Sequence, residues 1–146
     1  MNLPALLLIV TRLLFPGWET NYEHAKETAK QENKYILLNF SGSDWCGPCI
    51  RMHDEIFGSD AFKQLAGNNL VLVNADFPRL KKNQLSKEQQ KQNDHLADLY
   101  NQKGNFPLTL LLSADGQVLK EWVGFPQSGA EQFVNEVKAA CHGRQQ

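Results

Sequence analysis

The sequence predicts a single α/β domain with a central mixed β-sheet that is flanked by helices on both faces. Three apolar segments, at 35–40, 70–75 and 108–112, have the length and near-continuous hydrophobicity of strands that are buried on both faces. Helical patterns separate these strands, and an Asp-Gly turn signal at 114–116 follows the third. Strands that alternate with helices and end in a hairpin give a mixed sheet with helices on either side.

Composition and charge narrow the range of functions. The 146 residues suit one domain, and 42% hydrophobic with 21% charged residues is an ordinary globular composition. The 15 Lys and Arg residues are balanced by 16 Asp and Glu residues, which gives no electrostatic basis for binding nucleic acid or an anionic membrane. We therefore expect no nucleic-acid partner.

The N-terminal segment differs from the rest of the chain. An apolar run at 3–10 continues at 13–15, beyond Arg12. It is too short for a membrane-spanning helix and resembles a secretory signal peptide, although no Lys or Arg precedes it and no Ala-x-Ala site follows. We predict a signal peptide or apolar segment at 1–16 and a domain at 17–146, with no stable membrane span in the mature protein. The alternative is a first strand or helix of the domain.

The first predicted helix begins near Thr20. Thr20 and Glu23 have the spacing of a capping box, and the helix should run to about Gln31. Its buried face would consist of Tyr22, Ala25 and Ala29.

A turn at 41–44 joins the first apolar strand to a helix that we expect over 46–57. Ser43 or Asp44 would cap this helix with a side-chain oxygen. Pro48 suits its first turn, where the missing N–H removes no hydrogen bond within the helix. The first cysteine of the chain is therefore expected at a helix start.

The second half of the chain has a polar, lysine-rich stretch at 77–92. We interpret it as a solvated face, with a docking surface as the alternative. Its later part should join a helix that runs through Tyr100 and turns Leu96 and Leu99 inward.

The last predicted elements are a strand and a helix. The strand at 117–123 is expected to be antiparallel because it follows the hairpin signal. Ser128 and Glu131 form a second capping-box pattern before the final helix. The apolar stripe of that helix would be Phe133, Val134, Val137 and Cys141.

Cys46 and Cys49 are the strongest candidates for chemistry. Two cysteines separated by two residues at a helix start can form a disulfide without large backbone movement. The unsatisfied N–H groups and the helix dipole there stabilise a thiolate and lower the pKa of Cys46 from the free value of about 8.5. We expect Cys49, one turn deeper, to be less exposed. Cys46 is therefore predicted to attack and Cys49 to resolve.

The alternative for this pair is structural zinc, because zinc sites use the same C-x-x-C spacing. Zinc would need two more ligands, for which Cys141, His53 and His142 are the candidates. No second C-x-x-C or H-x₃-H unit is present, so we predict no metal. Cys141 is expected to be a buried spare thiol. His53 is expected to be a packed or half-exposed side chain, with a base that tunes the thiolate as the alternative.

The motif around the pair resembles the active site of the thioredoxin superfamily. It reads Trp45-Cys46-Gly47-Pro48-Cys49. The apolar strand before it, Phe106-Pro107 after it and 123–125 near the end occur in thioredoxin order, over about 18–141. The longer approach at 41–46 and the polar insertion after 76–78 resemble the exported branch, close to DsbH-like periplasmic oxidoreductases.

The resemblance implies a thioredoxin-like fold and a substrate-binding surface. Trp45, Gly47 and Pro48 would contact the substrate. Pro107 would be cis and would turn the backbone of Phe106 toward Cys46, where a substrate peptide pairs with it. A trans proline at a strand start is the alternative.

Two departures from the family pattern alter the expected chemistry. Many thioredoxins place a buried Asp under the second cysteine, but Asn39 occupies that position here, and Leu72 replaces the usual partner lysine. The helix also lacks the usual kink proline, with Asp54 near its place. We therefore expect a simpler pH dependence, with Cys49 deprotonated by water, by substrate or by another side chain.

The predicted function is dithiol–disulfide exchange on protein disulfides. It would need no metal or organic cofactor beyond the redox-active Cys46–Cys49 disulfide. The Gly-Pro interior resembles reducing thioredoxins, so we expect a monomeric reductase outside the cytoplasm with a membrane-borne thiol as electron donor. The alternatives are a disulfide oxidase or isomerase, a non-catalytic binding module of the same fold, and a cytoplasmic thioredoxin.

Overall fold

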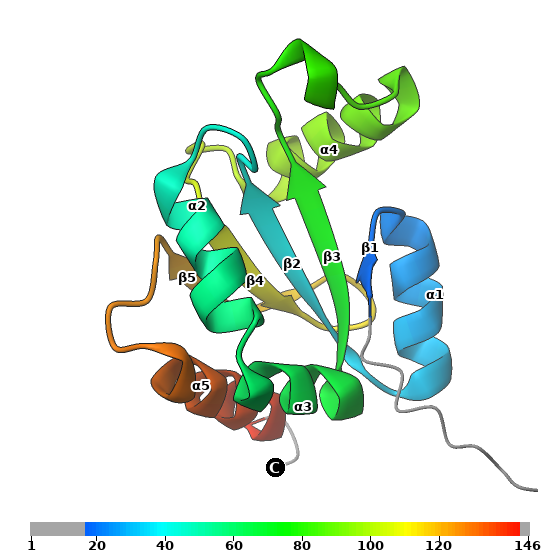
Figure 1. Cartoon of the computed structure of the whole chain (residues 1–146). Coiled ribbons are helices and arrows are strands. Elements are labelled where there is room, and N and C mark those ends of the chain that lie inside the picture. The colour runs from blue at the N-terminus through cyan, green and yellow to red at the C-terminus, as the bar shows by residue number, and fades with distance from the viewer. Residues whose placement is uncertain (1–16, 144–146) are drawn as a thin grey trace, which may run out of the picture.

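A five-stranded mixed sheet lies at the centre of the computed structural model, which describes residues 17–143 (Figure 1). The strands are β1 (Trp18–Glu19), β2 (Tyr35–Ser41), β3 (Leu70–Asp76), β4 (Leu108–Leu112) and β5 (Val118–Val123). The helices are α1 (Tyr22–Glu32), α2 (Gly47–Arg51), η1 (Met52–Phe57), α3 (Asp60–Asn69), η2 (Lys81–Asn83), α4 (Lys87–Tyr100) and α5 (Ala130–His142). The strand order is β1-β3-β2-β4-β5; β1, β3 and β2 are parallel, and β4 and β5 are antiparallel to their neighbours. The predicted α/β class is confirmed.

Both faces of the sheet are buried, which explains the continuous apolar strands. Leu37 belongs to the cluster that η1, α3 and α5 cover, whereas its neighbours Ile36 and Leu38 point into the cluster beneath α1. All three side chains are fully buried. Burial on both faces is typical of the central strands of a sheet with parallel neighbours.

Two of the predicted helix caps are wrong by one residue. Asn21, not Thr20, caps α1, because Asn21 is the extended residue whose side chain accepts the N–H of His24 at 3.0 Å. Likewise α5 starts after Gly129 rather than Ser128, and it has no side-chain cap. Gly129 has a φ of +88°, a conformation that glycine adopts without strain.

The helix predicted over 46–57 is present, but its winding changes midway. It is α-helical through α2 and π-helical through η1. The carbonyl oxygen of Asp54 then approaches Gly58 so closely that a side chain at Gly58 would collide with it. Single π-helical turns within a helix are frequent at functional sites.

The inward position predicted for Leu99 on α4 is also wrong. Leu96 is buried as expected, but Leu99 is 55% exposed. Tyr100 faces inward in its place, since its hydroxyl donates to the carbonyl oxygen of Gly116 at 2.7 Å and lies 2.9 Å from the hydroxyl of Tyr22. The hydrogen bonds of the Tyr100 hydroxyl, rather than the helical spacing of apolar residues, determine which side of the last turn of α4 packs inward.

The short strand β1 was not predicted. It pairs with Leu72 and Val73 at the edge of the sheet, and two residues give no periodicity to detect. The predicted signal peptide or apolar segment at 1–16 lies outside the described residues. Among residues 17–143, none of the helices has both the length and the apolar character needed to cross a bilayer.

Candidate functional site

Cys46 and Cys49 form a disulfide at the start of α2, with a Cα–Cα distance of 5.2 Å. Cys46 is itself the N-cap of α2, and its Sγ accepts the backbone N–H of Cys49 at 3.2 Å. The expected difference in exposure is nearly absent, because Cys46 is 5% and Cys49 4% exposed. The cap position, not burial, therefore distinguishes the two sulfurs in this disulfide state.

The predicted capping by Ser43 or Asp44 is wrong, because Cys46 is the N-cap and the other two side chains bind elsewhere. The Ser43 hydroxyl donates to Asp76, the last residue of β3, at 2.6 Å, and Asp44 binds the segment that follows β3. The Asp44 carboxylate accepts the backbone N–H groups of Arg79 at 2.9 Å and Leu80 at 3.0 Å, and the side-chain amide of Asn83 at 3.0 Å. These hydrogen bonds lower the pKa of Asp44 from its usual value. The turn before Cys46 is thus tied to the polar insertion.

Trp45 lies between the insertion and the approach to β4. Its Nε1 donates to the carbonyl oxygen of Phe77 at 2.7 Å. Its ring makes an edge contact with Phe106, with centroids 5.4 Å apart, and the Arg79 guanidinium lies 3.6 Å from its centroid. The indole of Trp45, the residue before Cys46, is therefore in contact with the aromatic ring of Phe106 and with the guanidinium of Arg79.

Phe106-Pro107 is the one cis peptide bond among residues 17–143, as the resemblance implied. The carbonyl oxygen of Pro107 accepts the N–H of Gly124 at 2.9 Å, which ties the end of β5 to this segment. Gly47 and Pro48 are exposed on the first turn of α2. The structure thus brings Trp45 and Phe106 into contact and leaves the first turn of α2 accessible.

A cavity of about 290 Å³ reaches Cys49 from the side of η1. Its lining consists of Trp18, Asn39, Ser41, Ser43, Cys49, Ile50, His53, Phe57 and Asn74. No Asp or Glu contributes to this lining, and His53, exposed on η1, is the side chain in it that can accept a proton apart from the cysteine. Asn39, expected under the second cysteine, lines the same cavity as Cys49.

Asn39 is held in a hydrogen-bonded polar network. Its Nδ2 donates to Oδ1 of Asn74 at 3.1 Å, and its Oδ1 accepts the hydroxyl of Thr109 at 3.1 Å. The hydroxyl of Ser41 lies 3.3 Å from Oδ1 of Asn74 and 3.3 Å from Oδ1 of Asp76, and it can donate to either oxygen. The sequence analysis did not predict this network. The signal for it is a pair of polar residues two positions apart at the end of each strand, 39 and 41 on β2 and 74 and 76 on β3, because such residues point to the same face of the sheet.

The remaining candidates lie elsewhere. Cys141 is buried in α5, and burial raises the pKa of its thiol to about 11. His142 is exposed at the end of the same helix. Within the described part of the chain, no three His, Cys, Asp or Glu side chains are close enough together to hold a metal ion.

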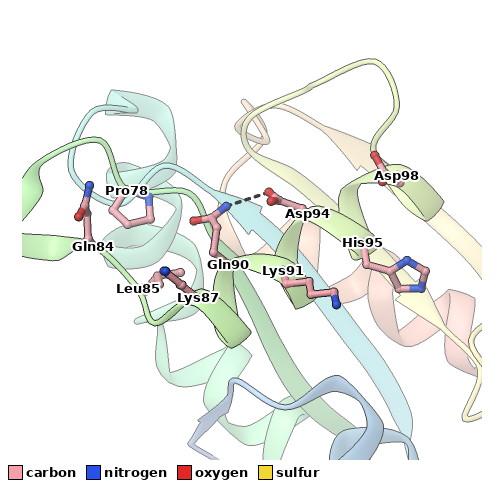
Figure 2. A pocket seen from close by; sticks show the side chains of 9 residues that line it. All are labelled: Pro78, Gln84, Leu85, Lys87, Gln90, Lys91, Asp94, His95 and Asp98. Carbon is pink, nitrogen blue, oxygen red and sulfur yellow. Dashed lines mark hydrogen bonds between the residues drawn. The ribbon is translucent and has the colours of Figure 1, made fainter.

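A second, larger hollow of about 590 Å³ lies along α4 (Figure 2). Its side chains come from α4 and the loop before it: Pro78, Gln84, Leu85, Lys87, Gln90, Lys91, Asp94, His95 and Asp98. Cations and carboxylates are mixed there, and Gln90 donates to Asp94 at 2.8 Å. None of the predicted site residues lines it, so it is separate from the cysteine pair.

Comparisons with known proteins identify the family of this chain. The profile of the Thioredoxin-like domain matches residues 22–140. The chain is 42% identical over 123 residues to a protein named disulfide bond reductase DsbH from Chlamydia pneumoniae, covering 84% of this chain and 71% of that protein. A solved structure named DsbH oxidoreductase superposes with a TM-score of 0.79 at 40% identity, covering 88% of this chain and 86% of that one. A thioredoxin from Thermus thermophilus has the same fold at 15% identity, with a TM-score of 0.68 and coverage of 90% and 92%.

Proposed function

The chain belongs to the thioredoxin-like family and is a thiol–disulfide oxidoreductase, and we propose that it reduces protein disulfides outside the cytoplasm with Cys46 as nucleophile and Cys49 as resolving thiol. The observation that carries the assignment is the bonded pair at the start of α2, in which Sγ of Cys46 accepts the N–H of Cys49. In the reduced protein the same donor would stabilise a thiolate at Cys46.

The reaction moves two electrons in two exchanges. The Cys46 thiolate attacks one sulfur of the substrate disulfide, which forms a mixed disulfide and releases the other substrate sulfur as a thiolate. Cys49 then loses its proton and attacks Sγ of Cys46. This step releases the second substrate thiolate and forms the Cys46–Cys49 disulfide, the state described here.

The cavity beside Cys49 supports a route for its proton. The polar side chains that line the cavity can hydrogen-bond water, and Asn39 cannot ionise. No carboxylate lines this cavity to compete for the proton. Water in the cavity, the departing substrate thiolate or His53 at its lining would accept it.

The surface around the pair supports binding of an extended substrate. Exposed apolar side chains occur on three segments next to it: Ile50 follows Cys49 on α2, the backbone of Leu80 binds Asp44, and Val123 pairs with Leu108 beside Pro107. Trp45 and Phe106 are in contact with each other. A substrate strand that pairs with the backbone of Phe106 would place its cysteine over the first turn of α2, which Gly47 and Pro48 leave open.

Reduction outside the cytoplasm requires a source of electrons. We propose a membrane-borne thiol partner that reduces the Cys46–Cys49 disulfide by the same exchange, with the protein acting as a monomer. The curated relative named as a disulfide bond reductase supports this direction. Fractionation of the native protein tests its location.

The direction of electron flow is tested by a redox titration of the pair. A reductase should equilibrate near the value of thioredoxin, about −270 mV, rather than that of DsbA, about −120 mV. A value close to that of DsbA would contradict the proposal and favour the oxidase.

A binding module of the same fold makes a different prediction. Replacing both cysteines with Ser would leave its partner binding and cellular phenotype intact, whereas it would abolish the proposed reductase. Measuring disulfide reduction and partner binding on the same double variant separates the two functions.

A further inference from the structure

Arg79 is held next to Trp45 by two contacts, one through its guanidinium and one through its backbone. The guanidinium lies 3.6 Å from the centroid of Trp45, the residue before Cys46. The backbone N–H of Arg79 is fixed by the Asp44 carboxylate at 2.9 Å. In Figure 1 the segment between β3 and α4 lies at the same end of the sheet as the start of α2. The insertion thus presents a cation at the edge of the substrate surface.

This guanidinium has no carboxylate partner among residues 17–143. Arg51 provides a comparison, because its guanidinium also lies over an aromatic ring, 4.2 Å from the centroid of Phe125. However, Glu55 occupies the donors of Arg51 at 3.1 and 3.3 Å. A guanidinium stacked on a ring keeps its edge donors directed outward, and those of Arg79 remain available for a ligand.

The charge around Arg79 favours an anion. Lys81 and Lys82 follow it and are exposed, and no Asp or Glu occurs between residues 77 and 87. Asp44 and Asp76 lie nearby and keep their negative charge, because the groups of the insertion and of Ser43 that donate to them are neutral. The cations at 79, 81 and 82 outnumber these two carboxylates, so the net charge of this rim is positive, although the chain as a whole is nearly neutral.

We propose that Arg79 is a carboxylate-binding subsite of the substrate surface, selecting protein disulfides that carry an Asp or Glu close to the cysteine that Cys46 attacks. The inference rests on the reductase function proposed above. A guanidinium binds a carboxylate through two parallel N–H···O bonds, and the stacked position over Trp45 fixes the plane in which these bonds form.

The size of the expected substrate preference follows from the exposure of the Arg79 side chain. Arg79 is exposed, so its ion pair with a substrate falls in the range of surface pairs, which corresponds to a preference of up to about fivefold. The preference should decrease with salt, because the Debye length shrinks from about 10 Å at 0.1 M to about 3 Å at 1 M ionic strength.

The test uses two disulfide-linked peptides that differ only in having Glu or Gln next to the attacked cysteine. The wild-type protein should show a kcat/KM for the Glu peptide about three- to fivefold above that for the Gln peptide at low salt. Arg79→Met should bring this ratio close to one, and Arg79→Lys should give an intermediate ratio, because Lys keeps the charge without the bidentate geometry.

The matched control is Lys120→Met, which removes another cation from above a tryptophan ring. The Nζ of Lys120 lies 5.4 Å from the ring centroid of Trp122. Lys120 is on β5, paired with Leu111 of β4. This control should keep the wild-type ratio. An unchanged ratio in Arg79→Met, or a wild-type ratio of one at low salt, would overturn the Arg79 inference alone. A wild-type protein that reduces neither peptide would overturn the reductase function as well.

Discussion

The backbone N–H of Cys49 donates a hydrogen bond of 3.2 Å to Sγ of Cys46, so the first cysteine caps the helix that contains the second. This contact distinguishes the two sulfurs although their exposure is almost equal. The donor stabilises negative charge on Cys46 only, because the N–H of Cys49 points toward the helix start.

The first prediction concerns this asymmetry. Cys49→Ala should accumulate mixed disulfides with substrate through Cys46, because the attacking thiolate remains and the resolving thiol is gone. Cys46→Ala should accumulate few or none. Non-reducing electrophoresis with mass spectrometry of the trapped species measures both. Equal trapping by the two variants would contradict the assignment of roles.

A second prediction concerns Asn39. Asn39→Asp introduces a carboxyl that is 95% removed from solvent, facing Oδ1 of Asn74. Burial should raise the pKa of that carboxyl above its unfolded value of about 3.9, so the variant loses stability as the pH rises above 4. The expected loss relative to wild type is about 1 to 3 kcal/mol between pH 4 and pH 8.

Urea unfolding at a series of pH values measures this loss. Asn39→Leu is the control, because it removes the hydrogen bonds with Thr109 and Asn74 without adding a charge, so its cost should not depend on pH. A pH profile of Asn39→Asp that parallels that of Asn39→Leu would show that the introduced carboxyl is not buried as described.

A third prediction concerns Gly42, which packs against the ring of Trp45. A Cβ at Gly42 would lie 2.5 Å from Nε1 of Trp45, so Gly42→Ala must displace the indole and break its hydrogen bond to Phe77. We expect a loss of about 1 to 3 kcal/mol in the free energy of unfolding and a changed tryptophan fluorescence spectrum. Gly47→Ala is the control for the spectrum, since no neighbouring atom lies within 4 Å of the added Cβ. Identical spectra for the two variants would contradict the tight contact.

A fourth prediction concerns Cys141. Since burial raises the pKa of its thiol to about 11, only about one molecule in 10³ carries a Cys141 thiolate at pH 8. In the reduced, folded protein, iodoacetamide should therefore modify Cys46 first and leave Cys141 intact. Peptide mapping after timed labelling measures this order, and labelling in urea, where all three cysteines react, is the control. Labelling of Cys141 at the rate of Cys46 in the folded protein would disprove its burial.

The sequence by itself determined the α/β class and most of the strand boundaries. Residues 108–112 are the strand as predicted, and 35–40 and 70–75 each extend by one residue. Continuous apolar segments are informative because a strand that is buried on both faces of a sheet needs apolar residues at nearly every position, and this pattern is visible in the sequence of that strand alone. The position of Cys46 at a helix start was equally local, since a turn and Pro48 adjoin it.

Only the tertiary structure decided which of several adjacent polar residues caps each helix. Thr20 and Asn21, or Ser43, Asp44 and Cys46, are too close in sequence for spacing to choose between them, and backbone direction and distant partners make the choice. Tertiary structure likewise decided that Tyr100 rather than Leu99 packs inward on α4.

The surroundings of the cysteine pair also depended on tertiary structure. Asp44 binds the backbone 35 and 36 residues further along the chain, and the Arg79 guanidinium lies over Trp45 from a similar distance in sequence. Contacts of this kind arise where the ends of neighbouring parallel strands meet at one edge of the sheet, and no local periodicity records them. The sequence therefore identified the two reactive sulfurs, and the packing of β2 beside β3 decided which side chains surround them.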